Sequence, residues 1–158
     1  MRFAGNVIWF VLGGWYIALI WLLGAAIFAI SIVGLPLTIA ALQMAKLSAW
    51  PFGKDVVHVR ELDAKGLTVT TAITGTVGFI ANVVWAFTFG VALFLAYLFA
   101  GVLCCITLIG IPFGLQSFKL AGISFWPVGR RVVSAELATL ARQENAKTKL
   151  ARYRGTPA

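Results

Sequence analysis

Two long stretches of this sequence contain no charged residue. Residues 5–33 form the first stretch and residues 72–118 the second. The hydrocarbon core of a bilayer is about 30 Å thick and needs roughly 20 apolar helical residues to cross it, because lipid offers no partner for exposed backbone amides. The two stretches therefore predict an integral membrane protein built from helices.

The composition excludes several other classes of protein. Hydrophobic residues make up 61% of the chain and charged residues only 11%, against about 45–50% and about 25% in soluble domains. These values argue against a water-soluble domain, a disordered chain and a nucleic-acid-binding domain. Cys104 and Cys105 are adjacent, so they predict no disulfide framework and no metal site, and we interpret them as inert packing residues.

The chain contains an internal repeat. Shifting the sequence by 76 positions places residues 5–57 on residues 81–133 without a gap, and 16 of the 53 positions are identical. Identities among Asn, Trp, Gly and Pro are more informative than identities among leucines, because these residues have backbone or interface roles. A cleaved signal peptide would not recur inside the mature chain. The most informative identities are Asn6/Asn82, Trp9/Trp85, Gly34/Gly110, Pro36/Pro112, Trp50/Trp126, Pro51/Pro127 and Gly53/Gly129.

Each repeat predicts the same two-helix unit. A long helix, residues 15–33 or 91–109, is followed by a Gly-x-Pro turn and a short helix, residues 37–49 or 113–125. The short helix is either a tilted span or a re-entrant half-helix packed inside protein. The fold class is therefore an all-α integral membrane protein, a tandem duplication with four membrane segments. The turn residues are Gly34, Pro36, Gly110 and Pro112.

Two regions lie outside the repeats at 5–57 and 81–133. In the linker, residues 58–80, a small cytoplasmic β-hairpin is expected, with strands at 56–62 and 67–72 around a turn at 63–66. The tail, residues 134–158, is expected to form a basic helix that suits the anionic inner leaflet.

The distribution of Lys and Arg predicts the topology. The N-terminus, the linker and the tail are basic, whereas neither Gly-x-Pro turn has a basic neighbour. By the positive-inside rule, both termini are cytoplasmic and both turns face outward in a multi-pass protein. The two repeats are then expected to run parallel rather than inverted.

Four polar residues on the short helices are the candidate functional residues. They are Gln43, Lys46, Gln116 and Lys119. One interpretation is that the lysines extend to the cytoplasmic interface. The alternative is that these residues face an aqueous path, in which lysines favour anions.

Other residues predict interface contacts. We interpret Asn6 and Asn82 as helix caps or interfacial hydrogen-bonding groups, because each opens a predicted helix. Arg130 and Arg131 are topology determinants and then contacts to lipid phosphate. The predicted interfacial anchors are Trp9, Trp50, Trp85 and Trp126.

The residues give no support for catalysis. No carboxylate lies in a predicted span, and the chain has a single histidine, His58. General acid–base or nucleophilic catalysis needs a titratable pair within reach, so we expect no enzyme, no cofactor and no metal. Gly90, Gly101 and Gly122 offer surfaces for close helix approach and predict a homo-oligomer.

Three repeated motifs resemble those of a known family. Asn-x-x-Trp, Gly-Ile-Pro-Phe-Gly at 110–114 and Trp-Pro-Val-Gly-Arg-Arg at 126–131 are similar to the YccF-type family of small bacterial inner-membrane proteins, which carry two inner membrane component domains. The resemblance covers nearly the whole chain. It implies a location in the bacterial inner membrane and little about activity. The first copy departs from the pattern at Leu35, Leu37 and Thr38.

Three functions fit these observations. The first is a homo-oligomeric channel or passive transport component that favours anions. The second is a non-catalytic accessory subunit of an envelope or transporter complex, and the third is a structural, lipid-organising protein. The expected partners are the lipid bilayer, anionic lipids at the cytoplasmic face, further copies of the chain and a membrane protein.

Overall fold

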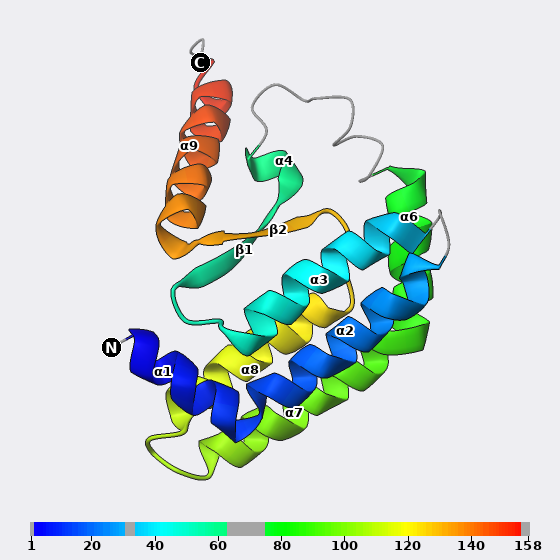
Figure 1. Ribbon diagram of the computed structural model, residues 1–158. Helices are drawn as coiled ribbons and strands as arrows, with labels where there is room; N and C mark the ends of the chain where they lie inside the picture. Colours follow the sequence, from blue (N-terminus) through cyan, green and yellow to red (C-terminus); the bar gives the residue numbers. More distant parts are fainter. Residues whose placement is uncertain (1, 31–33, 63–74, 156–158) are drawn as a thin grey trace.

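The computed structural model describes residues 2–30, 34–62 and 75–155, and the protein is mostly helical (Figure 1). Each half contributes a long kinked helix, a shorter helix and one β-strand. The first half contains α1 (Arg2–Trp9), η1 (Phe10–Gly14), α2 (Trp15–Ala29), α3 (Leu35–Ala49), β1 (Lys54–His58) and α4 (Val59–Leu62). The second half contains α6 (Thr76–Trp85), η3 (Ala86–Gly90), α7 (Val91–Cys105), α8 (Ile111–Ser124), β2 (Arg130–Ser134) and α9 (Ala135–Tyr153).

Two helices are long and apolar enough to cross a bilayer. They are Arg2–Ala29, with 28 residues, and Thr76–Cys105, with 30 residues, and α3 is a shorter apolar helix. In each long helix a π-helical turn, η1 or η3, separates two α-helical parts. At Gly13 the backbone leaves the helical conformation, with φ of 158° and ψ of −8°, so the predicted break separates two helical parts that meet at a kink.

The two Gly-x-Pro turns connect long and short helices, as the sequence predicts. Gly34 precedes α3 and Gly110 precedes α8, with proline in the first turn of each helix. Proline suits this position because its missing N–H would have no partner there. A side chain at Gly110 would collide with the Cys104 carbonyl. The resulting hairpins, α2 with α3 and α7 with α8, are the most closely packed pairs of elements.

The two strands relate the repeats by a pseudo-two-fold axis. β1 and β2 are antiparallel, and Val56 lies opposite Val132. These two residues occupy equivalent positions of the repeat, so the axis passes between them. Bonds at the strand ends agree, because Val59 N donates to Gly129 O at 2.8 Å and Ala135 N donates to Gly53 O at 3.1 Å. Each of these bonds is the counterpart of the other.

The prediction of a local hairpin gave the wrong partner for its first strand. β1 ends at His58, the next residues form α4, and β1 pairs with β2. The expected second strand, residues 67–72, lies outside the described residues. The prediction failed because pairing across 76 residues leaves no local turn signal in the sequence.

The long helices of the two repeats pack antiparallel to each other. The Tyr16 hydroxyl donates to Ala96 O at 3.4 Å, while the rings of Phe28 and Phe89 lie 6.2 Å apart. The start of α2 therefore lies near the middle of α7, and the end of α2 lies near the start of α7. The two hairpins point in opposite directions (Figure 1). The strands and the hairpins therefore share one pseudo-two-fold relation. The expected parallel orientation of the two repeats across the bilayer stays a prediction.

The strands and α9 lie together on one side of the hairpin helices, as a cap (Figure 1). The N-terminus reaches the same side, because Arg2 pairs with Glu136 of α9 at 2.7 Å. The cap, defined as β1, α4, β2 and α9, thus gathers the basic stretches that the sequence assigns to one side. On the hairpin helices, large apolar side chains such as Leu23 and Phe99 are exposed, which suits contact with lipid.

Candidate functional site

The repeated asparagines bind the segment that follows the short helix. Asn6 donates to Phe52 O at 3.1 Å and accepts from Phe52 N at 2.8 Å. Asn82 makes the same two bonds to Val128, at 3.2 and 2.9 Å. Neither residue caps a helix. Both are almost fully buried, and each satisfies a backbone N–H and C=O that would otherwise lose their partners.

Two of the four predicted interfacial tryptophans are core residues. Trp9 and Trp85 are buried, and their indole N–H groups donate to Ser48 O at 2.6 Å and to Ser124 O at 2.9 Å. The anchor prediction is wrong for these two because each indole N–H finds a partner inside the protein. Trp50 is half-buried and Trp126 is 37% exposed, so both remain candidate anchors.

A second aromatic pair lies on the pseudo-two-fold axis. Trp21 and Tyr97 occupy equivalent positions, and the Trp21 indole N–H donates to the Tyr97 hydroxyl at 3.1 Å. Tyr97 also bonds to the Ser48 hydroxyl. The Trp21 ring stacks on Trp85 with centroids 5.0 Å apart. These buried contacts join the two hairpins into one core.

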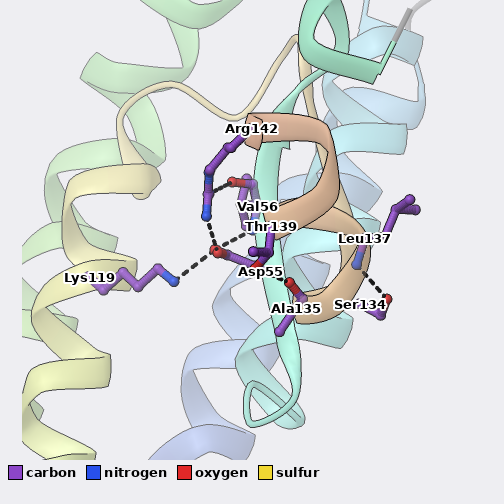
Figure 2. A network of polar contacts seen from close by, with 8 residues as sticks. All are labelled: Asp55, Val56, Lys119, Ser134, Ala135, Leu137, Thr139 and Arg142. Atoms are coloured by element: carbon purple, nitrogen blue, oxygen red, sulfur yellow. Dashed lines mark hydrogen bonds and ion pairs between the residues drawn. The ribbon is translucent and has the colours of Figure 1, made fainter. Parts of the chain in front are cut away.

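Lys119 does not project alone into the membrane. Its ammonium lies 2.7 Å from Asp55 Oδ1 in β1, and Arg142 of α9 lies 2.8 Å from Asp55 Oδ2 (Figure 2). Partial burial by itself would raise the pKa of Asp55, but the hydrogen bonds from Arg142 and Lys119 outweigh burial and hold the pKa below its usual value. One carboxylate therefore links α8, β1 and α9.

The other predicted polar residues fall in different places. Gln43 and Lys46 line a groove of about 470 Å³ between α3 and the strands, together with Lys54 and Arg131. We call this groove the cationic groove. Its remaining lining residues are Gly53, Val132, Val133 and Ser134. The structure does not bring Lys119 into it.

Gln116 and Arg130 are not brought into the cationic groove either. Gln116 is half-buried on α8. The Arg130 side chain donates to Trp126 O at 2.9 Å, which holds it against its own turn. Of the two arginines predicted to contact lipid phosphate, Arg131 is therefore the exposed one that lines a groove.

Sequence reasoning missed Asp55 and Lys54 as members of the polar site. Comparison of the two copies could have pointed to these positions, because Asp55 corresponds to Arg131 and Lys119 corresponds to Gln43. A carboxylate in the first copy thus stands where the second copy has an arginine, and a lysine in the second copy stands where the first has a glutamine. Such a reversal of charge between copies indicates positions that share an environment but bind different partners.

The glycines predicted to mediate oligomerisation are mostly used inside the chain. A Cβ at Gly101 would collide with the Phe118 ring, and one at Gly90 would contact Ser124 O at 3.5 Å. At Gly122 a Cβ would meet nothing within 4 Å. Gly122 is therefore the glycine of the three that stays available for approach by another helix. In the described residues there is no cluster of three metal-ligating side chains.

The repeat and its motifs match a known family. Residues 4–54 and 80–130 each match the inner membrane component domain of YccF, and the two matches begin 76 residues apart. This chain belongs to the YccF family. The match confirms the predicted duplication and the resemblance, and the protein is an inner-membrane protein of that family.

Curated relatives of the YccF family cover the chain almost completely. The chain is 44% identical over 147 residues to "Inner membrane protein YccF" of Escherichia coli strain K12. The alignment covers 93% of this chain and 97% of the relative. The identically titled protein of Shigella flexneri matches to the same extent. No solved structure matches.

Proposed function

We propose that this protein is a non-catalytic accessory or structural subunit of an inner-membrane complex, and that α9 contacts its partner. The observation that carries the proposal is the exposed apolar surface of α9. Leu137, Leu140, Leu150 and Tyr153 are exposed, with fractions between 47% for Leu137 and 92% for Tyr153. Large apolar groups exposed on a charged helix are typical of a helix that docks against another surface.

The way α9 is held supports this role. Ala138 is fully buried, Arg142 pairs with Asp55 of β1, and Asn145 donates to Glu61 O of α4 at 3.0 Å. The side of α9 that carries these residues is thereby held against β1 and α4, and Leu137, Leu140 and Leu150 point away from it. We place the cap at the cytoplasmic surface, because its basic residues follow the positive-inside rule.

The charge of α9 indicates the chemistry of the partner. Lys147, Lys149 and Arg154 lie among the exposed apolar groups, and Glu144 is paired with Lys147. A membrane protein whose cytoplasmic surface is acidic around an apolar groove would complement this pattern.

The experiment that tests the proposal is photo-cross-linking in cells. A photoreactive amino acid replaces Leu140 or Tyr153, and a matched control replaces Phe99, which is exposed on α7. We expect one discrete, stoichiometric adduct from the α9 positions and none of that size from Phe99. A chain ending at residue 143 keeps Arg142 and its ion pair and should lose the adduct obtained through Leu140. Adducts only from Phe99 would overturn the proposal.

A homo-oligomeric, anion-favouring channel is the second candidate. The observation that favours it is the cationic groove, because a lining of lysine, arginine and amide groups without a carboxylate favours anions. In proteoliposomes, K46Q/R131Q should shift the reversal potential towards cation selectivity, and K147Q/K149Q should leave it unchanged. Absence of ion flux through the unmodified protein would remove this candidate.

A further inference from the structure

Two pairs of positions that are related by the pseudo-two-fold axis carry different residues. In one place Lys119 and Asp55 form an ion pair of 2.7 Å, which Arg142 of α9 completes (Figure 2). At the equivalent positions the chain has Gln43 and Arg131, which line the cationic groove. The pseudo-two-fold axis gives both places the same backbone frame. Where the strand of the first half carries a carboxylate, Asp55, the strand of the second half therefore carries a cation, Arg131.

The cationic groove has no internal anion. Lys46, Lys54 and Arg131 line its volume of about 470 Å³, and no Asp or Glu is among the lining residues. None of these three cations forms an ion pair within the part of the chain that the structure describes. Converging cations on a polar wall bind phosphate, with Arg as a bidentate donor and Lys as a point charge.

A second, apolar groove adjoins the cationic groove at Lys46. It has a volume of about 410 Å³, and Lys46 supplies its only charged lining residue. We call it the apolar groove. Its other lining residues are Phe10, Trp15, Ala18, Leu19, Leu22, Leu42, Ala45 and Ala49. The pair of grooves thus runs from the cap, with three cations, onto the lipid-exposed surface of α2 and α3.

We propose that these adjoining grooves bind one anionic phospholipid. The phosphate of its headgroup contacts Lys46, Lys54 and Arg131, and an acyl chain lies along the apolar groove. A free phosphate would satisfy the cations but would leave the apolar groove unused, whereas an anionic lipid matches both. The inference is independent of the proposed docking role of α9, because the two surfaces share no residue.

The test measures lipid binding by the delipidated full-length protein in detergent. Native mass spectrometry follows the titration with phosphatidylglycerol, with phosphatidylcholine and inorganic phosphate as parallel probes. We expect phosphatidylglycerol to be retained in preference to phosphatidylcholine, and K46Q/K54Q/R131Q to weaken that retention about 10- to 100-fold. The matched control K147Q/K149Q/R154Q removes the same charge from α9 and the residue that follows it, and should change retention less than about twofold.

A second pair of variants separates this site from general attraction to charge. Q43K/R131D rebuilds the lysine–carboxylate pair of Lys119 and Asp55 at the positions related to it by the pseudo-two-fold axis, so it should fold and yet lose the retained lipid. A49F places a ring in the apolar groove and should weaken phosphatidylglycerol without weakening inorganic phosphate. Equal losses in the groove and α9 triple variants would overturn the proposal. Phosphate binding as tight as phosphatidylglycerol binding would overturn the choice of a lipid.

Discussion

At the scale of single residues, the repeat preserves hydrogen bonds rather than surface features. Asn6 and Asn82 make the same two bonds to Phe52 and Val128, and Trp9 and Trp85 make the same indole bond. These polar residues stay identical between copies because each satisfies buried backbone groups that have no alternative partner in an apolar environment. The repetition of these residues could be found in the sequence, but the hydrogen bonds that they make could be seen only in the structure.

The asparagine bonds predict matched losses of stability. Replacing Asn6 or Asn82 by Ala leaves one buried N–H and one buried C=O without a partner, which should cost about 2–4 kcal/mol for each variant. Thermal unfolding in detergent measures the effect, and N145A, which removes a single bond on the cap, should cost far less. A change below 1 kcal/mol in both variants, as with exposed asparagines, would contradict the structural role.

The ion pair network of Asp55 predicts a dependence on pH. Its pKa in the folded protein is lowered from 3.8, so its stabilising effect is present above that value and disappears as the pH falls through the lowered pKa. D55N should therefore be less stable than the unmodified protein at pH 6, by about 1 kcal/mol because the site is partly solvated. The difference in melting temperature should shrink towards pH 3. E144Q is the control, and a gap independent of pH would refute the assignment.

The predictions made from sequence at this scale succeeded where local geometry decides the outcome. Pro36 and Pro112 begin helices because proline needs no N–H partner in a first turn. Trp9 and Trp85 were assigned to the interface because tryptophan is common there, and the carbonyls of Ser48 and Ser124 that bind them are 39 residues away in sequence. Nothing local distinguishes a buried indole with a partner from an interfacial one.

At the scale of elements, helices could be predicted from the sequence and the strand pairing could not. Both long helices, both short helices and α9 lie where composition and the Gly-x-Pro turns place them. The strands Lys54–His58 and Arg130–Ser134 are only five residues each, and they pair across the repeat. Gly53 and Gly129, with φ of +93° and +88°, turn the chain into these strands at equivalent positions. The presence of glycine at this position in both copies was the sequence feature that could have indicated the two strands.

The strand register predicts a specific disulfide. Val59–Gly129 and Gly53–Ala135 are hydrogen-bonded pairs three positions either side of Val56–Val132, so the central pair is not hydrogen-bonded. Such pairs bring the Cα atoms to about 4.5 Å, within the range for a disulfide. With Cys104 and Cys105 replaced by Ala, V56C/V132C should oxidise readily.

The control for this cross-link is V57C/V132C, in which the two side chains point to opposite faces of the sheet. It should remain reduced under the same oxidant. Loss of maleimide labelling, together with a mass two hydrogens lower, identifies the disulfide in the intact protein. Equal oxidation of both variants would show that the strands slide or do not pair in this register.

At the scale of the whole molecule, the pseudo-two-fold axis decides how the hairpins lie relative to the cap. Both short helices end beside the strands, and the hairpins point in opposite directions from that centre (Figure 1). The short helices α3 and α8, which run from the turns to the strands, have 15 and 14 residues, or about 21–22 Å at 1.5 Å per residue. A helix of that length does not span about 30 Å of hydrocarbon. The length therefore favours the re-entrant alternative for both short helices.

This interpretation predicts equal accessibility at the two turns. Ile30 and Ile106 are equivalent residues, 90% and 74% exposed. With Cys104 and Cys105 replaced by Ala, I30C and I106C should resist a membrane-impermeant thiol reagent applied to intact cells, yet react with a permeant one. L140C on the cap is the control and should react with the impermeant reagent only in inverted vesicles. Labelling of both turns from outside would establish four spans, and labelling of one turn alone would contradict the two-fold relation between the hairpins.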